Sequence, residues 1–465
     1  MSSLGAVLAI ATATLIVLLP RHRAMMPILA AVCFLPIGQS LQVAGLNFYL
    51  FRLVLFASLV RIVIRGEARD VRWCRLDTLV FCWAAVVVVF GTLGNPGLTP
   101  FITLLGALYN GLASYVVCRA LVTDRKEFLI QLRFLAIMAV PLAVAMTLEK
   151  ATGRNIFAIL GGVPEFTFVR DGKVRAQGAF KHPILAGTFG ATLLPLMVAM
   201  AGMRDRSLKW SGVVGTACAA FIAWAAASSG AFLAAAGGVA ALCLWPLRRS
   251  LRAVRIAAVL LVLVLQAGMN RPVWWIFDSI GGLTGGSGWH RSYIIDAAIR
   301  HFREWWLIGT PVTAHWGGYP PPPGDPNNID LTNQFVVEAV GGGALRLFLF
   351  AAIIWLCFRS LGRAFRARGA SIQPQTEWLA WCVGVTLLAH CVCFFSVAYF
   401  DQMIFYWFWL LSVIAAGTMQ GTWLIRDRST DSIRRSTALK SRVAASPPEE
   451  ERRTLASLLT RHRER

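Results

Sequence analysis

The sequence predicts an all-α polytopic membrane protein with about 12 or 13 transmembrane helices, and three observations support this class. Of the 465 residues, 57% are hydrophobic and only 15% are charged, which is less charge than a soluble domain usually carries. Apolar runs recur along the chain, and many approach the roughly 20 residues that cross a bilayer as a helix. Basic residues gather in every second connection between these runs.

The apolar runs give the positions of the expected helices. The first two runs are short, and for this reason the count stays between about 12 and 13. The expected spans are residues 4–19, 25–37, 46–64, 76–90, 101–118, 128–148, 184–201, 211–226, 231–247, 254–267, 343–358, 379–395 and 403–424.

The distribution of positive charge orients these helices. Most of the 45 Lys and Arg residues lie in alternate connections or in the C-terminal tail, and the positive-inside rule places those segments in the cytoplasm. The polytopic domain, residues 1–424, then carries two long outer loops, residues 149–183 and 268–341. The tail, residues 425–465, is predicted to be basic and cytoplasmic, and either disordered or bound to the surface of anionic lipid. Because topology and tail explain the net charge of +22, we expect no nucleic-acid partner.

Two common features of exported proteins are not expected. No basic stretch precedes the first apolar run and Arg21 follows it, which is the reverse of a secretory signal peptide. The 10 cysteines are scattered among the spans and predict neither a disulfide framework nor a CxxC metal site.

The first outer loop predicts a β-hairpin. Alternating residues flank Asp171-Gly172, a two-residue turn signal, and Arg175 falls on the returning strand. Arg170 and Lys173 beside the turn are expected to be solvated. After His182, Pro183 suits the first turn of the next helix, whose free N–H groups would face an outer anion.

The second outer loop predicts an amphipathic helix, because apolar residues recur at helical spacing from 294 to 302. Arg291 falls at the start of this helix, where the helix dipole disfavours a cation, and it is therefore a functional candidate. Further polar candidates follow the helix, and these are His315, Asp330, Asn333 and Glu338.

Three segments resemble the O-antigen ligase and polymerase family of membrane glycosyltransferases, which use polyprenyl-diphosphate-linked glycans. They are RAQGAFKHPILAGTFGATLLPL, RSYIIDAAIRHFREWWLIGT and LTNQFVVEAVGGGALRLFLF. The resemblance covers about residues 101–361. It implies a fold like that of type C glycosyltransferases, a location in the bacterial inner membrane and a reaction on the extracytoplasmic side.

The resemblance also implies partners and residue roles. The partners are a polyprenyl-diphosphate-linked glycan donor, a lipid or glycan acceptor, membrane lipids, and polysaccharide export or assembly proteins. The candidate catalytic residues are Arg175, Arg291, Asp330 and Glu338, and the candidate substrate-binding residues are His182, His315, Asn333 and Arg346. Because the outer loops have no paired carboxylates, we expect the arginines to neutralise the diphosphate without a metal or other cofactor.

Several of these residues have an equally simple structural explanation. Glu338 can pair with Arg346, Asn333 can cap a helix, and His182 and His315 can be ordinary loop histidines. Two arginines inside spans, Arg52 and Arg346, can reach the membrane surface with their long side chains.

The chain departs from the family pattern at two positions. Thr332 stands where a proposed histidine base is often found, so that either Asp330 or His315 would supply the base, or an already reactive acceptor would need none. Ser229 stands where the family often has an arginine. A transporter or flippase for a lipid-linked or anionic solute is the alternative function, and a non-catalytic scaffold is a third.

The predicted topology can be tested with reporter fusions. A fusion at Pro322 should report an extracytoplasmic position and a fusion at Ser429 a cytoplasmic one, because basic connections stay in the cytoplasm. Both fusions on the same side of the membrane would contradict this topology.

Overall fold

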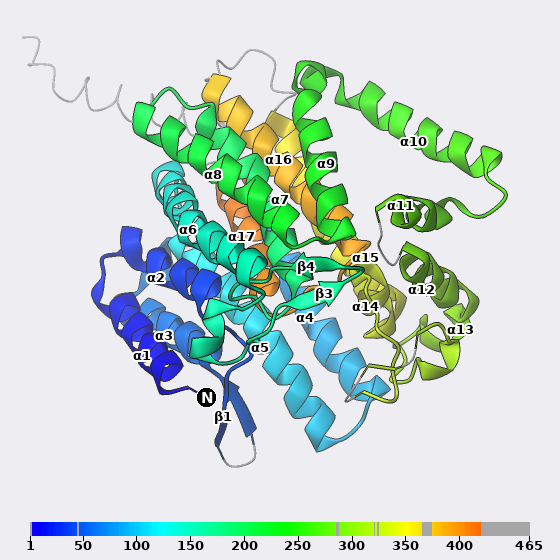
Figure 1. Ribbon diagram of the computed structural model, residues 1–465, viewed down its shortest axis with the longest axis horizontal. Coiled ribbons are helices and arrows are strands. Elements are labelled where there is room, and N and C mark those ends of the chain that lie inside the picture. The colour runs from blue at the N-terminus through cyan, green and yellow to red at the C-terminus, as the bar shows by residue number, and fades with distance from the viewer. Residues whose placement is uncertain are drawn as a thin grey trace, which may run out of the picture. The chain divides into compact units, whose positions relative to one another are not determined.

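The computed structural model describes residues 2–43, 46–284, 288–319, 321–322, 325–364 and 374–419. This part of the chain is helical apart from loops and two small hairpins (Figure 1). Nine helices within it are long and apolar enough to cross a membrane. The fold therefore agrees with the predicted class, an all-α polytopic membrane protein. The predicted tail, residues 425–465, lies outside the described residues.

The N-terminal part holds six helices and both hairpins. Its elements are α1 (Ser3–Leu18), α2 (Arg21–Phe34), β1 (Ser40–Val43), β2 (Leu46–Tyr49), α3 (Leu50–Arg65), α4 (Arg75–Gly94), α5 (Leu98–Leu121), α6 (Arg125–Thr152), β3 (Phe168–Arg170) and β4 (Lys173–Arg175). The strands pair antiparallel, β1 with β2 and β3 with β4.

The C-terminal part alternates long helices with the shorter helices of residues 268–341, the segment predicted to be the second outer loop. The long helices are α7 (Pro183–Ala201), α8 (Arg206–Ala225), α9 (Ser229–Cys243), α10 (Leu251–Gly268), α15 (Gly343–Ala364), α16 (Pro374–Phe394) and α17 (Gln402–Ile414). The loop contains α11 (Ile276–Thr284), α12 (Gly288–Arg300), α13 (Phe302–Trp305), the 3-10 turn η5 (Ala314–Trp316) and α14 (Gln334–Val340).

A helix lies at every predicted span, and residues 420–424 of the last one, 403–424, lie outside the described residues. Three boundaries need correction, and the first is that the span predicted at 25–37 was wrong at its end, because α2 ends at Phe34. The span predicted at 46–64 was wrong at its start, because residues 46–49 pair with β1 and the helix begins at Leu50. The span predicted at 231–247 was wrong at its end, because α9 ends at Cys243. With 15 residues, α9 is about 22 Å long at 1.5 Å per residue, less than the roughly 30 Å apolar core of a bilayer. The total of 12 or 13 spans stays a prediction.

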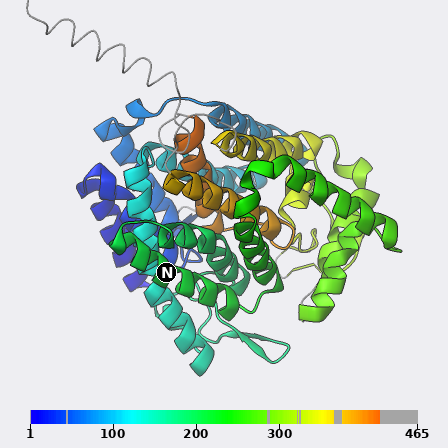
Figure 2. The ribbon, with the colours of Figure 1, turned by 90° about the horizontal axis from the view of Figure 1, so that it is seen from above.

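The buried centre of the membrane domain is formed by α7 and the last span. In the most apolar 18-residue stretch of each span, 83% of the residues are buried in α7 and 89% in the last span, Gln402–Met419. In the span Trp245–Gly268, none of the residues of this stretch is buried. Helices α1–α3 and helices α11–α13 lie on opposite sides of this centre (Figures 1 and 2). Because α7 is enclosed by its neighbours, its N-terminus has a fixed place beside the outer loops.

Small residues bring α7 against α8. A Cβ atom added to Gly190 on α7 would lie 2.6 Å from the backbone nitrogen of Ala223 and 2.7 Å from the carbonyl oxygen of Ala219. Membrane helices commonly pack closely through such residues, because lipid gives no hydrophobic drive for helix association.

We predict that Gly190→Ala lowers the thermal stability of the purified protein, because the methyl group meets backbone atoms that cannot rotate away. Overpacking of this kind costs roughly 1–3 kcal/mol. Gly237→Ala on α9 is the matched control, since its nearest neighbour, a methyl group of Val392, is 3.8 Å away. Equal melting temperatures for the two variants would contradict the close contact of α7 and α8.

Candidate functional site

A cavity of about 880 Å³ lies where the two outer loops meet. Its walls come from the β3–β4 hairpin, the start of α7, the α8–α9 connection, α12 and the loop before α14. Five cationic side chains but only two carboxylates line it, and these are Lys150, Arg170, Lys173, Arg175 and Arg291, with Asp171 and Asp330. We call it the arginine cavity. Its excess of positive charge favours an anionic ligand.

The predicted hairpin forms one wall. Asp171 and Gly172 at its turn both have positive φ angles, 52° and 71°, as a tight two-residue turn requires. Phe168 pairs with Arg175 across the strands, and the guanidinium carbon lies 5.9 Å from the centre of the Phe168 ring. The strand pairing therefore fixes the backbone position of Arg175 at the cavity wall.

Arg175 is buried, with 6% of its surface exposed, and its Nε donates to the carbonyl oxygen of Ala226 at 3.3 Å. Burial, followed by the positive charge of Arg170, lowers the pKa of Arg175. Among the described residues it has no ion pair with a carboxylate. Its charge is therefore only partly compensated by the protein.

Glu149, at the end of α6, fixes the turn that follows Arg175. Its carboxylate accepts the backbone N–H groups of Gln177 at 3.1 Å and Gly178 at 2.8 Å. The next residue, Lys150, donates to the carbonyl oxygen of Val174 at 2.9 Å. The two side chains thus hold both ends of the short segment that carries Arg175, a role that the sequence alone did not indicate.

His182 caps α7 at the edge of the cavity. Its Nδ1 accepts the N–H of Ile184 at 3.1 Å, and Pro183 is the first residue of the helix, as predicted. Burial, and then the charges of Arg175 and Arg170, lower the pKa of His182 to about 4. The imidazole is therefore neutral at pH 7, with its proton on Nε2.

Arg291 reaches the same cavity from α12. Its Nη1 donates to the hydroxyl oxygen of Ser229 at 3.0 Å, and its buried Nε has no hydrogen-bond partner among the described residues. Burial, and then the charges of Arg170 and Arg175, lower the pKa of Arg291 to about 10. Two arginines more than 100 residues apart in sequence thus belong to one electrostatic site.

Asp330 and His290 also line the cavity, and they contact each other. The Nε2 of His290 lies 2.9 Å from the carbonyl oxygen of Asp330 and must carry the proton, because a carbonyl only accepts. The buried Nδ1 then has a free lone pair, and no partner for it lies in the part of the chain described. Burial lowers the pKa of His290, which favours this neutral form.

Three of the other candidates, Glu338, Arg346 and Asn333, do not line the arginine cavity. Glu338 accepts hydrogen bonds from Arg346 at 2.7 Å, Trp83 at 2.8 Å and Gln334 at 2.7 Å. Asn333 caps α14 through the N–H of Val336 at 3.2 Å. These are the structural explanations that the sequence left open for Glu338, Arg346 and Asn333.

The two remaining candidates also lie outside the cavity lining. His315 contacts Glu304, 2.9 Å from its Nε2, on the second outer loop. Arg52 on α3 donates to the side-chain oxygen of Asn110 at 3.1 Å and lies over the ring of Tyr49.

The cavity also has lining residues that were not among the sequence candidates. These are Lys150, His290 and Tyr319, together with Arg170 and Lys173, which are exposed, as expected of solvated loop charges, but also line the cavity. The DG turn was a usable signal for the last two, because a two-residue turn brings both of its flanking side chains close to Arg175. No local pattern singles out His290.

Comparison with protein-family models finds no match, and comparison with curated proteins finds none either.

The cap at His182 predicts a dependence of stability on pH. The native pKa of about 4 lies below the ordinary 6.5, so the unfolded chain binds a proton first as the pH falls. Stability contributed by neutral His182 is therefore present above pH 6.5 and lost between about pH 6.5 and 4. His182→Asn retains a capping side chain without a proton to bind.

Thermal unfolding of the purified protein between pH 4 and 7.5 measures this dependence. The wild-type melting temperature should fall more steeply below pH 6.5 than that of His182→Asn. His22→Asn, at an exposed histidine, is the control and should follow the wild type. Parallel curves for the wild type and His182→Asn would show that the cap histidine does not resist protonation.

Proposed function

We propose that this chain is a membrane glycosyltransferase that ligates or polymerises lipid-diphosphate-linked glycan units. The reaction would take place on the extracytoplasmic side of the bacterial inner membrane, during synthesis of a surface polysaccharide such as O-antigen or exopolysaccharide. The observation that carries the proposal is that Arg175 and Arg291, from separate outer loops, line one cavity of about 880 Å³. The family resemblance of three sequence segments supports the same reaction.

The charge of the cavity suits a diphosphate leaving group. A diphosphate carries at least two negative charges, and arginine binds phosphate oxygens through two parallel N–H groups. Arg175 and Arg291 would flank the diphosphate, and Arg170 would add a third guanidinium group at the rim. The free N–H groups at the start of α7 would face the same anion. No metal or other cofactor is part of the proposal.

The cavity also suits a sugar. A volume of about 880 Å³ is within the usual range of ligand sites, roughly 300–1,000 Å³, and leaves room beside the diphosphate. Aromatic side chains at the cavity wall, Phe168, Trp224 and Tyr319, offer apolar faces on which a sugar ring can lie. The outer loops thus provide both parts of a glycosyl-diphosphate site.

The proposed reaction breaks the bond between the anomeric carbon and the diphosphate oxygen, and forms a glycosidic bond to an acceptor hydroxyl. The electron pair of the broken bond leaves on the polyprenyl diphosphate, where the arginines stabilise it. The acceptor proton passes to a base in the cavity. Asp330 remains a candidate base, and His290, with a free Nδ1 lone pair, is a second. His290 thus offers an imidazole where Thr332 replaces the expected histidine.

The remaining candidates have supporting positions in this proposal. Glu338, Arg346 and Asn333 would hold α14 and the end of the second loop, and His182 would hold the start of α7. Ser229, which replaces an arginine of the family pattern, would orient Arg291 through its hydroxyl. A transporter of lipid-linked or anionic solutes is the alternative, and it predicts movement of substrate without bond cleavage.

We predict that Arg175→Ala and Arg291→Ala each lower surface-polysaccharide synthesis by about 100-fold or more, the usual loss when a group that stabilises transition-state charge is removed. The lysine variants should recover only part of the activity, because lysine keeps the charge but loses the paired N–H groups. The measurement is polysaccharide length and abundance in a strain lacking the native copy, with protein level determined by immunoblot.

Arg154→Ala is the matched control for this experiment. Arg154 lies on the same outer loop, pairs with Glu165 at 3.5 Å and is not among the cavity residues. Lys173 would be a poor control because it lines the cavity. Normal polysaccharide from both cavity variants would place the site elsewhere and remove the main physical support for the transferase.

A further inference from the structure

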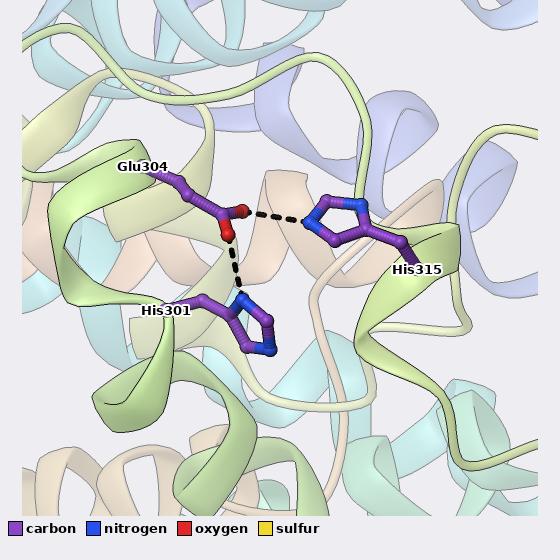
Figure 3. Close-up of side chains that lie close together, drawn as sticks. All are labelled: His301, Glu304 and His315. Carbon is purple, nitrogen blue, oxygen red and sulfur yellow. Dashed lines mark hydrogen bonds and ion pairs between the residues drawn. The ribbon is translucent and has the colours of Figure 1, made fainter.

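A second cluster of polar side chains lies on the second outer loop, and its residues do not line the arginine cavity. His301 follows α12, Glu304 lies on α13 and His315 lies on the 3-10 turn η5 (Figure 3). One donor atom from each residue lies within 4.8 Å of the other two. His301 Nδ1 is 2.7 Å from one carboxylate oxygen of Glu304, and His315 Nε2 is 2.9 Å from the other. We call these three residues the His–Glu cluster.

Neighbouring aromatic residues orient the cluster. The indole N–H of Trp316 donates to Glu304 at 2.9 Å, and the His301 ring stacks on Trp316 with an interplanar angle of 12°. The carbonyl oxygen of Trp316 accepts the hydroxyl of Tyr293 at 2.5 Å. Metal-binding side chains usually have such partners, because these fix the direction of the donor atoms.

The donor types match one group of metal ions. Two imidazole nitrogens and one carboxylate suit zinc and similar transition ions, whereas magnesium and calcium prefer oxygen ligands alone. Zinc ligands bind at about 2.0–2.2 Å, which puts tetrahedral donors about 3.4 Å apart. The present separations of 2.7 and 2.9 Å therefore need only small side-chain movements to admit an ion.

The cluster is accessible to an ion and to water. The exposed fractions of the His301, Glu304 and His315 side chains are 28%, 37% and 51%. Three protein ligands leave one position of a tetrahedral zinc ion for a water molecule. His301 and Glu304 lie before a loop and His315 after it, so a shared ion would join its two ends.

We propose that His301, Glu304 and His315 bind one zinc ion, which clamps η5 to α13. The clamp fixes the start of the segment that leads through Gly317 and Gly318 to Tyr319, a residue of the arginine cavity. The three residues lie outside the cavity lining, and their binding of zinc does not require the proposed transferase activity. The expectation that no metal is needed concerned only neutralisation of the diphosphate in the arginine cavity.

Zinc binding can be measured on the full-length protein, purified in detergent, treated with EDTA and desalted. Zinc is then titrated against a chromophoric chelator, and bound metal is counted by mass spectrometry. The wild type should bind one zinc ion per chain. His301→Ala and His315→Ala should bind zinc at least about tenfold more weakly. Even the loss of a residue that only supports a ligand typically lowers metal affinity by about that much.

Three further variants separate the possible causes. Glu304→Gln removes the carboxylate ligand but keeps the shape of the side chain, so it tests the site if an alanine variant fails to fold. His22→Ala removes an exposed histidine elsewhere and should bind zinc normally. Arg291→Ala should also bind zinc normally, which keeps this result distinct from that of the transferase experiment.

Hydrogen exchange provides a second readout. Zinc should slow amide exchange in the segment 306–319 of the wild type and leave that of His315→Ala unchanged. A wild type that binds no zinc beyond the level of the His301→Ala and His315→Ala variants would overturn the proposal. So would variants that retain the wild-type affinity.

Discussion

Arg175 and Arg291 are held in one cavity without a carboxylate partner among the described residues, and the proposed site depends on this arrangement. The other arginines buried in the described part of the chain are neutralised directly. Arg61 and Arg119 pair with carboxylates at 2.6 and 2.7 Å, and the half-buried Arg346 pairs with one at 2.7 Å. A carbonyl and a hydroxyl oxygen offset far less of a buried charge than a carboxylate does. The cavity thus keeps a positive potential that a multiply charged anion would offset. Incompletely neutralised buried charge is more typical of a binding site than of residues that only support the fold.

The framework around this potential is made of residues whose hydrogen bonds are satisfied. Glu149 accepts backbone N–H groups behind Arg175, and His182 caps the helix beside it. On the other loop, Glu338 is held between Arg346, Trp83 and Gln334, so α14 is fixed to α4 and α15. A carboxylate with three donors and 1% exposure is well suited to hold helices together and poorly suited to accept a substrate proton. Side chains whose polar atoms all have hydrogen-bond partners therefore support the fold. Side chains with unpartnered polar atoms are the better candidates to contact a substrate.

Much of the fold could be predicted because it depends on short-range patterns. Apolar runs marked the helices, the DG turn marked the hairpin, and Pro183 marked the start of α7. The predicted meeting of Arg175 and Arg291 rested on their shared outer side, and both line one cavity. The sequence could not separate a catalytic Glu338 from one paired with Arg346, because both uses need an acid near the membrane surface. It gave no sign of His290, whose Nε2 contacts a carbonyl oxygen 40 residues away in the sequence. It also missed the strand at 46–49, because pairing with residues 40–43 outweighs an apolar composition that suits a helix equally well.

The most direct measurement is a transfer reaction with the purified protein in proteoliposomes containing a defined polyprenyl-diphosphate-linked oligosaccharide. The products are separated and identified by mass spectrometry. Glycosyl transfer predicts a glycan lengthened by whole units, or joined to an added acceptor, together with an equal amount of released polyprenyl diphosphate. Intact lipid-linked oligosaccharide moved across the bilayer without bond cleavage would contradict a transferase and would identify the protein as a transporter.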